Sequence, residues 1–200
     1  TPVLRENLDG LEGRIALFGG SFDPLHLGHL LAAEAARAAL ELDAVVFVPA
    51  WRNRLKEHAP LGSDGERLAL IARNLEPNPA FSVCPIELRL GRPSVSVDTA
   101  RWAAAQLGPG SELFMLLGSD CLSSLDRWVA PAELFTLAAP IVVERPGWGP
   151  EQIERLSGTL PDNLLEVMRR HWLPPVGTIS STEIRERLRA GHDVGGLVVT

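Results

Sequence analysis

The residues best placed to do chemistry are two histidines three positions apart, His26 and His29, within residues 19–29. This segment lies between an apolar run at residues 15–18 and an alanine-rich amphipathic run at residues 27–40. That order predicts a strand, a tight turn and the start of a helix. Unpaired N–H groups and the positive dipole end of a helix attract anions, and both imidazoles can project to one side of the first turn. The segment therefore predicts a phosphate site.

The rest of the segment fits this interpretation without matching the common phosphate loops. Gly19 and Gly20 allow a sharp turn and a close approach of the backbone to phosphate, and Pro24 stiffens the approach to the helix. There is no Gly-x-Gly-x-x-Gly and no Gly-Lys-Ser/Thr, so neither a dinucleotide fingerprint nor a Walker loop is indicated. A pair of histidines alone does not predict a metal site.

Composition bounds the class of protein. The chain has 200 residues, 46% of them hydrophobic, which suits a single globular domain spanning residues 1–200. No apolar run reaches the ~18 residues of a membrane span, and no secretory signal opens the sequence. Two cysteines, Cys84 and Cys121, form no disulfide framework; we expect both to be buried, and the protein to be cytoplasmic.

The charge balance excludes one class of partner. A formal net charge of −6 argues against non-specific binding of nucleic acid, although a nucleotide needs only a local basic pocket. Arginine dominates the basic residues, and its forked donors suit phosphate. Arg52, Arg54 and Lys56 stand in a loop at residues 49–63, where they either meet phosphate or remain solvated. The sequence does not decide between a monomer and a homo-oligomer.

Strands and helices alternate along the chain, which predicts one α/β domain with a parallel sheet. The first helix is expected to bury Leu27, Leu30, Leu31, Ala35 and Ala38. Strands are expected at about 14–18, 44–48, 81–84, 113–117 and 140–143. Helices are expected at about 27–40, 64–75, 96–107, 131–134, 152–156 and 164–171, with a further helix starting near residue 180.

Ligands in open α/β sheets bind beyond the carboxyl ends of the strands. Gly118-Ser119-Asp120 follows a buried strand, so a carboxylate should lie within reach of a ribose. Trp128 either packs in the core or stacks on an aromatic ligand, whereas His171 is an ordinary helix-end residue. Near the end of the chain, Ser180 and Glu183 form a capping box, and Arg185 lies on the same helix. These residues predict a second phosphate clamp.

Residues 19–29 also resemble the G-x-F-x-P-x-H-x-G-H signature of the nucleotidyltransferase superfamily. Further matching pieces follow in the family's order, so that most of the chain is similar to the bacterial nicotinate-nucleotide adenylyltransferases. These pieces are residues 93–99, residues 118–120 with Trp128, residues 145–147 and residues 179–185. The resemblance implies a Rossmann-like doubly wound parallel sheet flanked by helices. It also implies transfer of the adenylyl group of ATP to nicotinate mononucleotide, giving nicotinate adenine dinucleotide and pyrophosphate in NAD biosynthesis.

The resemblance assigns roles to particular residues. The catalytic residues it implies are His26, His29 and Arg185. The nucleotide-binding residues it implies are Gly19, Gly20, Ser21, Phe22, Gly28, Lys56, Gly118, Asp120, Ser180 and Ser181. The substrate-binding residues it implies are Ser94, Ser96, Trp128, Val129 and Arg145, with Trp128 stacking on the nicotinate ring. Mg²⁺ is expected to be bound by the substrate rather than by the protein.

Three positions depart from the family pattern. Leu55 replaces a frequent histidine, Val95 replaces an aromatic residue, and Val129 stands where an aromatic residue or histidine often follows the tryptophan. All three concern the loops around the substrates. A superfamily enzyme that prefers nicotinamide mononucleotide or another phosphorylated acceptor is therefore the alternative, and a non-catalytic nucleotide sensor is a more distant one.

Overall fold

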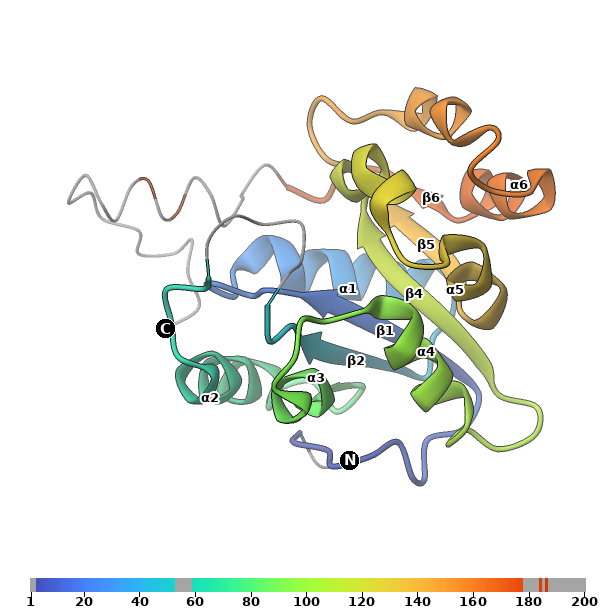
Figure 1. Ribbon diagram of the computed structural model, residues 1–200. Helices are drawn as coiled ribbons and strands as arrows, with labels where there is room; N and C mark the ends of the chain where they lie inside the picture. Colours follow the sequence, from blue (N-terminus) through green and yellow to red (C-terminus); the bar gives the residue numbers. More distant parts are fainter. Residues whose placement is uncertain (1–2, 53–58, 178–183, 185, 187–200) are drawn as a thin grey trace.

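The computed structural model describes residues 3–52, 59–177, 184 and 186. These residues contain a six-stranded sheet in the order β3-β2-β1-β4-β5-β6 (Figure 1). The strands are β1 (Arg14–Gly20), β2 (Ala44–Pro49), β3 (Phe81–Val83), β4 (Glu112–Gly118), β5 (Ala139–Val143) and β6 (Trp172–Leu173). Every neighbouring pair is parallel. The strand order reverses between β1 and β4, which makes the carboxyl ends of these two strands the topological switch point where ligands bind.

Helices cover both faces of the sheet (Figure 1). The α-helices are α1 (Leu27–Ala39), α2 (Asp64–Leu75), α3 (Ile86–Leu90), α4 (Ser96–Ala104), α5 (Pro131–Leu137) and α6 (Asp162–Arg170). The 3₁₀ segments are η1 (Ser119–Arg127), η2 (Pro150–Gln152) and η3 (Glu154–Leu156). The expected doubly wound, Rossmann-like α/β fold is confirmed.

Each central strand sends alternate side chains to opposite layers of the core. In β1, Ile15 and Leu17 pack in the cluster that includes residues of α4, α5 and α6. Ala16 and Phe18 pack in the other cluster, with α1 and α2. A strand buried on both faces reads as an apolar run without polar alternation, which is why these strands could be located from the sequence.

The expected apolar stripe of α1 was wrong at Leu27, Leu31 and Ala38, which are exposed, while Leu30 packs partly buried against the core. The buried positions of this helix are Gly28, Ala32, Ala33 and Ala36, whereas Leu27 and Leu31 are 38% and 40% exposed. Small side chains let a helix lie close to a sheet, so the alanines face the strands. The prediction placed the larger leucine side chains toward the core, and it therefore assigned the wrong face of α1 to the sheet.

Several smaller expectations also changed. Residues 86–90 form α3, residues 119–127 form η1, and β6 adds an edge strand, none of which was expected. α4 ends at Ala104 rather than near residue 107, and residues 152–156 are 3₁₀ rather than α-helical. Cys84 is buried as expected, but Cys121 is only partly buried. The helix expected from residue 180 lies outside the described residues except at Ile184 and Glu186, which are both helical.

No helix in the described parts of the chain combines the length and the apolar character needed to cross a bilayer.

Candidate active site

The two histidines meet at the start of α1. His26 is the N-cap residue, and its ring stacks on that of His29 with 3.7 Å between centroids and 29° between planes. The backbone N–H of His26 donates to Nδ1 of His29 at 3.2 Å. A neutral imidazole that accepts at Nδ1 carries its proton on Nε2. His29 can therefore donate a hydrogen bond from Nε2.

His26 lies deeper than its partner. It is only 1% exposed, and Nδ1 has no hydrogen-bond partner among the described residues. Burial, followed by the positive charge of Arg145, lowers the pKa of His26 from 6.5 to about 4. Its ring is therefore neutral near pH 7. The charge of Arg145 therefore acts on the His26 ring.

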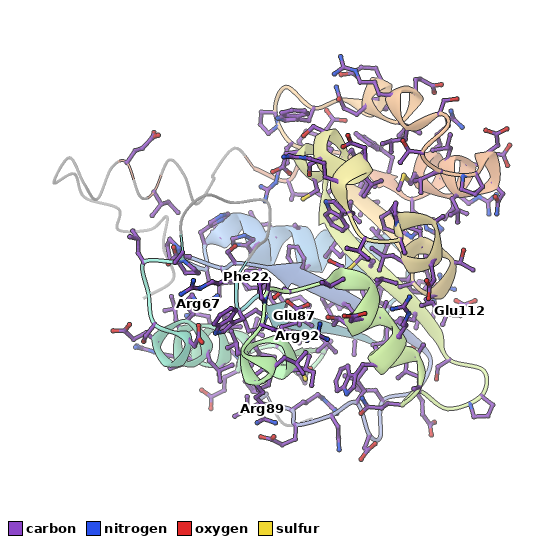
Figure 2. The ribbon with its side chains drawn as sticks, viewed as in Figure 1. Phe22, Arg67, Glu87, Arg89, Arg92 and Glu112 are labelled. Carbon is purple, nitrogen blue, oxygen red and sulfur yellow. The ribbon has the colours of Figure 1, made fainter. Side chains whose placement is uncertain are left out.

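The turn before α1 is held in an unusual conformation. Phe22 has a φ of +42°, a value that costs free energy for any residue with a side chain. Its ring is 2% exposed and packs against Phe18, Phe47 and His29, with centroid distances of 5.5, 5.5 and 5.0 Å (Figure 2). A Cβ at Gly20 would lie 3.0 Å from this ring. The Phe22 ring thus packs under the turn, so a ligand would contact the backbone of the turn rather than this ring.

A hollow opens beside the turn, over the carboxyl ends of β1, β4 and β5. Its lining residues are Phe18, Ala32, Leu116, Leu117, Gly118, Val143 and Arg145. A Cβ at Gly118 would overlap Oδ1 of Asp120 and lie 3.2 Å from Nε of Arg145. The structure therefore brings Gly118, Asp120 and Arg145 to one place, at the switch point. The hollow has an apolar wall and one carboxylate and one guanidinium at its rim.

A second hollow lies between α3 and the start of α4. It is lined by Glu87, Leu90, Arg92, Pro93, Ser94, Val95, Asp98 and Thr99, and Figure 2 shows Glu87 and Arg92 together near the middle of the molecule. The Ser94 hydroxyl accepts from the Trp51 backbone N–H at 3.1 Å, and the Ser94 N–H donates to the Arg52 carbonyl at 3.1 Å. Ser94 thus connects this hollow to the loop after β2. The expected phosphate contact of Arg52 stays a prediction; its guanidinium lies 4.8 Å from the Trp51 ring centroid.

The floor of this second hollow is a buried carboxyl group. Glu87 is 6% exposed, and its Oε1 accepts from the Thr99 hydroxyl at 2.6 Å. Burial raises the pKa of Glu87, and hydrogen bonds from Ser94 and Thr99 partly offset that effect. Glu87 therefore joins α3 to α4 and to the Ser94 loop. Sequence reading missed it, although a glutamate within the otherwise apolar residues 83–88 was a signal.

The first turn of α4 offers backbone donors beside this hollow. Its N-cap residue is Val95, which has no side-chain acceptor. The N–H groups of Ser96 and Val97 donate to no acceptor in the part of the chain that the structure describes. Such a helix start suits a carboxylate. Ser96, named from the sequence, is therefore positioned to contribute through its backbone.

Trp128 follows η1 and is only partly buried, packing against the core cluster while its Nε1 donates to the Ser124 hydroxyl at 3.4 Å. The interpretation of Trp128 as a core residue therefore holds in part, whereas its stacking on an aromatic ligand stays a prediction. The next residue, Val129, is 46% exposed. Lys56, Ser180, Ser181 and Arg185 lie outside the described residues.

Sequence reading also missed Arg67, which is 3% exposed on α2 (Figure 2). Its terminal nitrogens donate to the carbonyl oxygens of Ser21 and Ala50 and to the Asp64 carboxylate. The spacing of Arg67 with Ile71 and Leu75, four residues apart each time, places an arginine on the buried stripe and could have indicated it.

No group of three or more His, Cys, Asp or Glu side chains in residues 3–52 and 59–177 is arranged to bind a metal ion. Glu112, the first residue of β4, lies apart from Glu87 and Arg92 of the second hollow (Figure 2).

Sequence comparisons point to one group of enzymes. A family model described as cytidylyltransferase-like matches residues 17–187. A curated probable nicotinate-nucleotide adenylyltransferase of Herpetosiphon aurantiacus is 38% identical over 187 residues, which cover 92% of this chain and 91% of the relative. Another of the same name, from Thermus thermophilus, is 41% identical over 181 residues, covering 90% and 89%.

Solved structures share the fold. The nicotinic acid mononucleotide adenylyltransferase of Plasmodium falciparum, complexed with NaAD, matches with a TM-score of 0.66 and 17% identity. The match covers 92% of this chain and 87% of that chain. At this identity the likeness supports the arrangement of strands and helices alone.

Proposed function

Because the chain belongs to the cytidylyltransferase-like family, and within it to the nicotinate-nucleotide adenylyltransferases, we propose that it joins ATP to nicotinate mononucleotide. The products are nicotinate adenine dinucleotide and pyrophosphate, and the reaction is a step of NAD biosynthesis. The observation that carries the proposal is the stacked His26–His29 pair at the start of α1, near the hollow lined by Gly118 and Arg145, with Asp120 next to Gly118.

The chemistry needs positioning rather than a strong base. A phosphate oxygen of the mononucleotide is already anionic and attacks the α-phosphorus of ATP, forming a new phosphoanhydride bond as the bond to the β-phosphate breaks. Pyrophosphate leaves with the electron pair. The N-terminal end of α1, the two imidazoles and Arg145 stabilise the negative charge that grows on the departing group. Because the His26 ring is neutral near pH 7, it acts on the phosphates as a hydrogen-bond donor rather than as a cation.

The two hollows divide the substrates between them. The backbone of Gly19, Gly20, Ser21 and Gly28 approaches the triphosphate, and Asp120 accepts from a ribose hydroxyl. At the other hollow, the start of α4 near Ser96 and the backbone of Val129 receive the nicotinate carboxylate. Trp128 stacks on the pyridine ring, and Ser94 fixes the loop between them. Lys56, Ser180, Ser181 and Arg185 complete the phosphate contacts in this proposal, on the strength of the sequence resemblance alone.

Mg²⁺ would be bound by phosphate oxygens and water. The described residues offer no cluster of three side-chain ligands for it, and Mg²⁺ commonly keeps several waters when it accompanies a nucleotide. When present, it would neutralise part of the triphosphate charge. The residues of this chain would then position the complex and stabilise the remaining charge.

The deciding experiment measures pyrophosphate release from ATP and Mg²⁺ with each mononucleotide in turn. We expect release with nicotinate mononucleotide at a higher kcat/KM than with nicotinamide mononucleotide. A reversed preference would favour the alternative acceptor. Calorimetric binding of ATP without pyrophosphate release from either mononucleotide would favour a nucleotide sensor instead.

We also propose a cytoplasmic location, with small molecules as the partners and neither nucleic acid nor a membrane. The formal net charge of −6 supports the first exclusion.

A further inference from the structure

Arg67 is an arginine on the buried stripe of α2, one turn before Ile71, and only 3% of it is exposed. Burying a guanidinium costs free energy unless its N–H groups are paired. Its Nε–H group has no partner among the described residues, whereas both terminal nitrogens do. The acceptors of these two terminal nitrogens therefore offset the cost of burying the Arg67 guanidinium.

The acceptors belong to three different segments. Nη1 donates to the carbonyl oxygens of Ser21 and Ala50, at 2.7 and 2.9 Å, and Nη2 donates to Asp64 Oδ1 at 2.7 Å. The Ala50 N–H in turn donates to the Gly20 carbonyl at 2.8 Å. One side chain thus joins the segments after β1 and β2 to the first turn of α2.

A second connection runs alongside the first. The Asp23 carboxylate accepts from the N–H groups of Leu61 and Gly62, at 2.8 and 3.1 Å, just before α2 begins. A Cβ at Gly62 would lie 3.3 Å from Arg67 Cγ and 3.6 Å from Asp23 Oδ1, so the two connections are adjacent. Between Ser21 and Asp23 stands Phe22, whose φ of +42° is costly. The turn is thus fixed on both sides of its strained residue.

We propose that Arg67 is a positioning residue for the adenylyl transfer: it fixes the turn that delivers His26, His29 and the start of α1 to the triphosphate. This inference rests on the proposed function. Arg67 touches no reacting atom and acts through the backbone of Ser21. A displacement of about 1 Å in such a turn can lower the rate by about 10²-fold. Lysine cannot replace it, because a single ammonium group lacks the planar fork that reaches divergent acceptors.

The test compares Arg67→Gln and Arg67→Lys with Leu75→Ala, which removes a fully buried side chain from the same stripe two turns away. Pyrophosphate release gives kcat and the KM for ATP, and thermal unfolding gives Tm. We expect kcat to fall about 10- to 100-fold in both Arg67 variants, with the KM for ATP changed by less than about threefold. Leu75→Ala should lower Tm at least as much as the Arg67 variants do. Its kcat per folded molecule should stay within about twofold of the wild-type value.

Gly62→Val provides a gentler variant that retains the guanidinium. Its side chain would push on Arg67 and Asp23 from outside, and we expect a fall in kcat of about threefold or more. If the Arg67 variants lower Tm but keep the wild-type kcat, Arg67 is only structural and the inference is overturned. If the Arg67 variants do not fold, a wild-type kcat in Gly62→Val overturns it as well. A wild-type protein that releases no pyrophosphate would instead count against the proposed function.

Discussion

His26 and His29 show how one turn of helix can give two identical side chains different environments. His29 accepts a backbone hydrogen bond at Nδ1, which fixes which of its ring nitrogens donates outward. His26 is almost completely buried, and its pKa of about 4 keeps it uncharged near neutral pH. In the proposed reaction, these histidines would therefore meet the triphosphate as hydrogen-bond donors, and the fixed positive charge would come from arginine.

Replacing either histidine should remove turnover rather than folding. We expect His29→Ala and His26→Ala each to lower kcat by about 10²- to 10³-fold, as for loss of one donor to a developing charge. Circular dichroism and Tm check that the variants are folded, and pyrophosphate release measures the rate. A folded His29→Ala protein with a near-native rate would refute the assignment of this residue.

The depressed pKa of His26 also makes stability depend on pH. The unfolded chain binds a proton near pH 6.5, but the native protein resists it until about pH 4. Stability is therefore complete above pH 6.5 and falls as pH decreases from 6.5 to 4, by at most about 3 kcal/mol. Urea unfolding at pH 7 and pH 5 measures the difference.

In this experiment the free energy of unfolding of His26→Gln should fall less between pH 7 and pH 5 than that of the wild type, because glutamine does not titrate. His171 provides the control: burial lowers its pKa as well, so His171→Gln should retain the part of the slope due to His26. An unchanged slope in His26→Gln would mean that His26 does not titrate as described.

At the scale of elements, short hydrogen bonds between neighbouring helices hold the substrate loops in place. Glu87 on α3 accepts from Thr99 on α4, and the same network includes Ser94. This arrangement fixes the start of α4, where backbone N–H groups face the second hollow. The hydroxyl of Thr99 is thus the contact on which the relative position of α3 and α4 depends.

Thr99→Val removes this donor while keeping the shape of the side chain. We expect the free energy of unfolding to fall by about 1–3 kcal/mol, because a buried carboxyl group loses a partner. Thr136→Val is the matched control, since Thr136 is exposed and bonds only within α5; a change within about 0.5 kcal/mol is expected there. Equal losses in the two variants, measured by urea unfolding, would contradict this role for Thr99.

At the scale of the whole molecule, both helical layers share a single sheet. β1 and β4 each contribute side chains to both core clusters, so the sheet connects the two layers. The first hollow lies over the carboxyl ends of β1, β4 and β5. The second lies between α3 and the start of α4, which follow β3 in the chain. The catalytic geometry therefore depends on both halves together.

We expect the chain to unfold in one cooperative transition, consistent with a single domain over residues 1–200. Urea curves followed by far-ultraviolet circular dichroism and by tryptophan fluorescence should coincide. Saturating ATP should shift both curves together, by about 3 kcal/mol at a ligand concentration of 100 times Kd. Two separate transitions would show that the halves fold independently.

The sequence by itself located β1 to β5 and the helices α1, α2, α4, α5 and α6. It also predicted a phosphate site at the start of α1. Apolar runs such as residues 44–48 are buried on both faces, and the spacing of His26 and His29 is set by one helical turn. Such features are local, so neighbouring residues suffice to define them. The family resemblance rested on the same local motifs.

Only the tertiary structure decided which face of each helix is buried and which side chains from distant parts of the chain are in contact. The alanine face of α1, the burial of Arg67 and the contact of Glu87 with Thr99 depend on what packs opposite each side chain. Phe22 belongs to a cluster of aromatic rings, because Phe18 from β1, Phe47 from β2 and His29 from α1 all contact it. Pairings between segments far apart in the chain are set by packing of the complete sheet and helices, which no short stretch of sequence encodes.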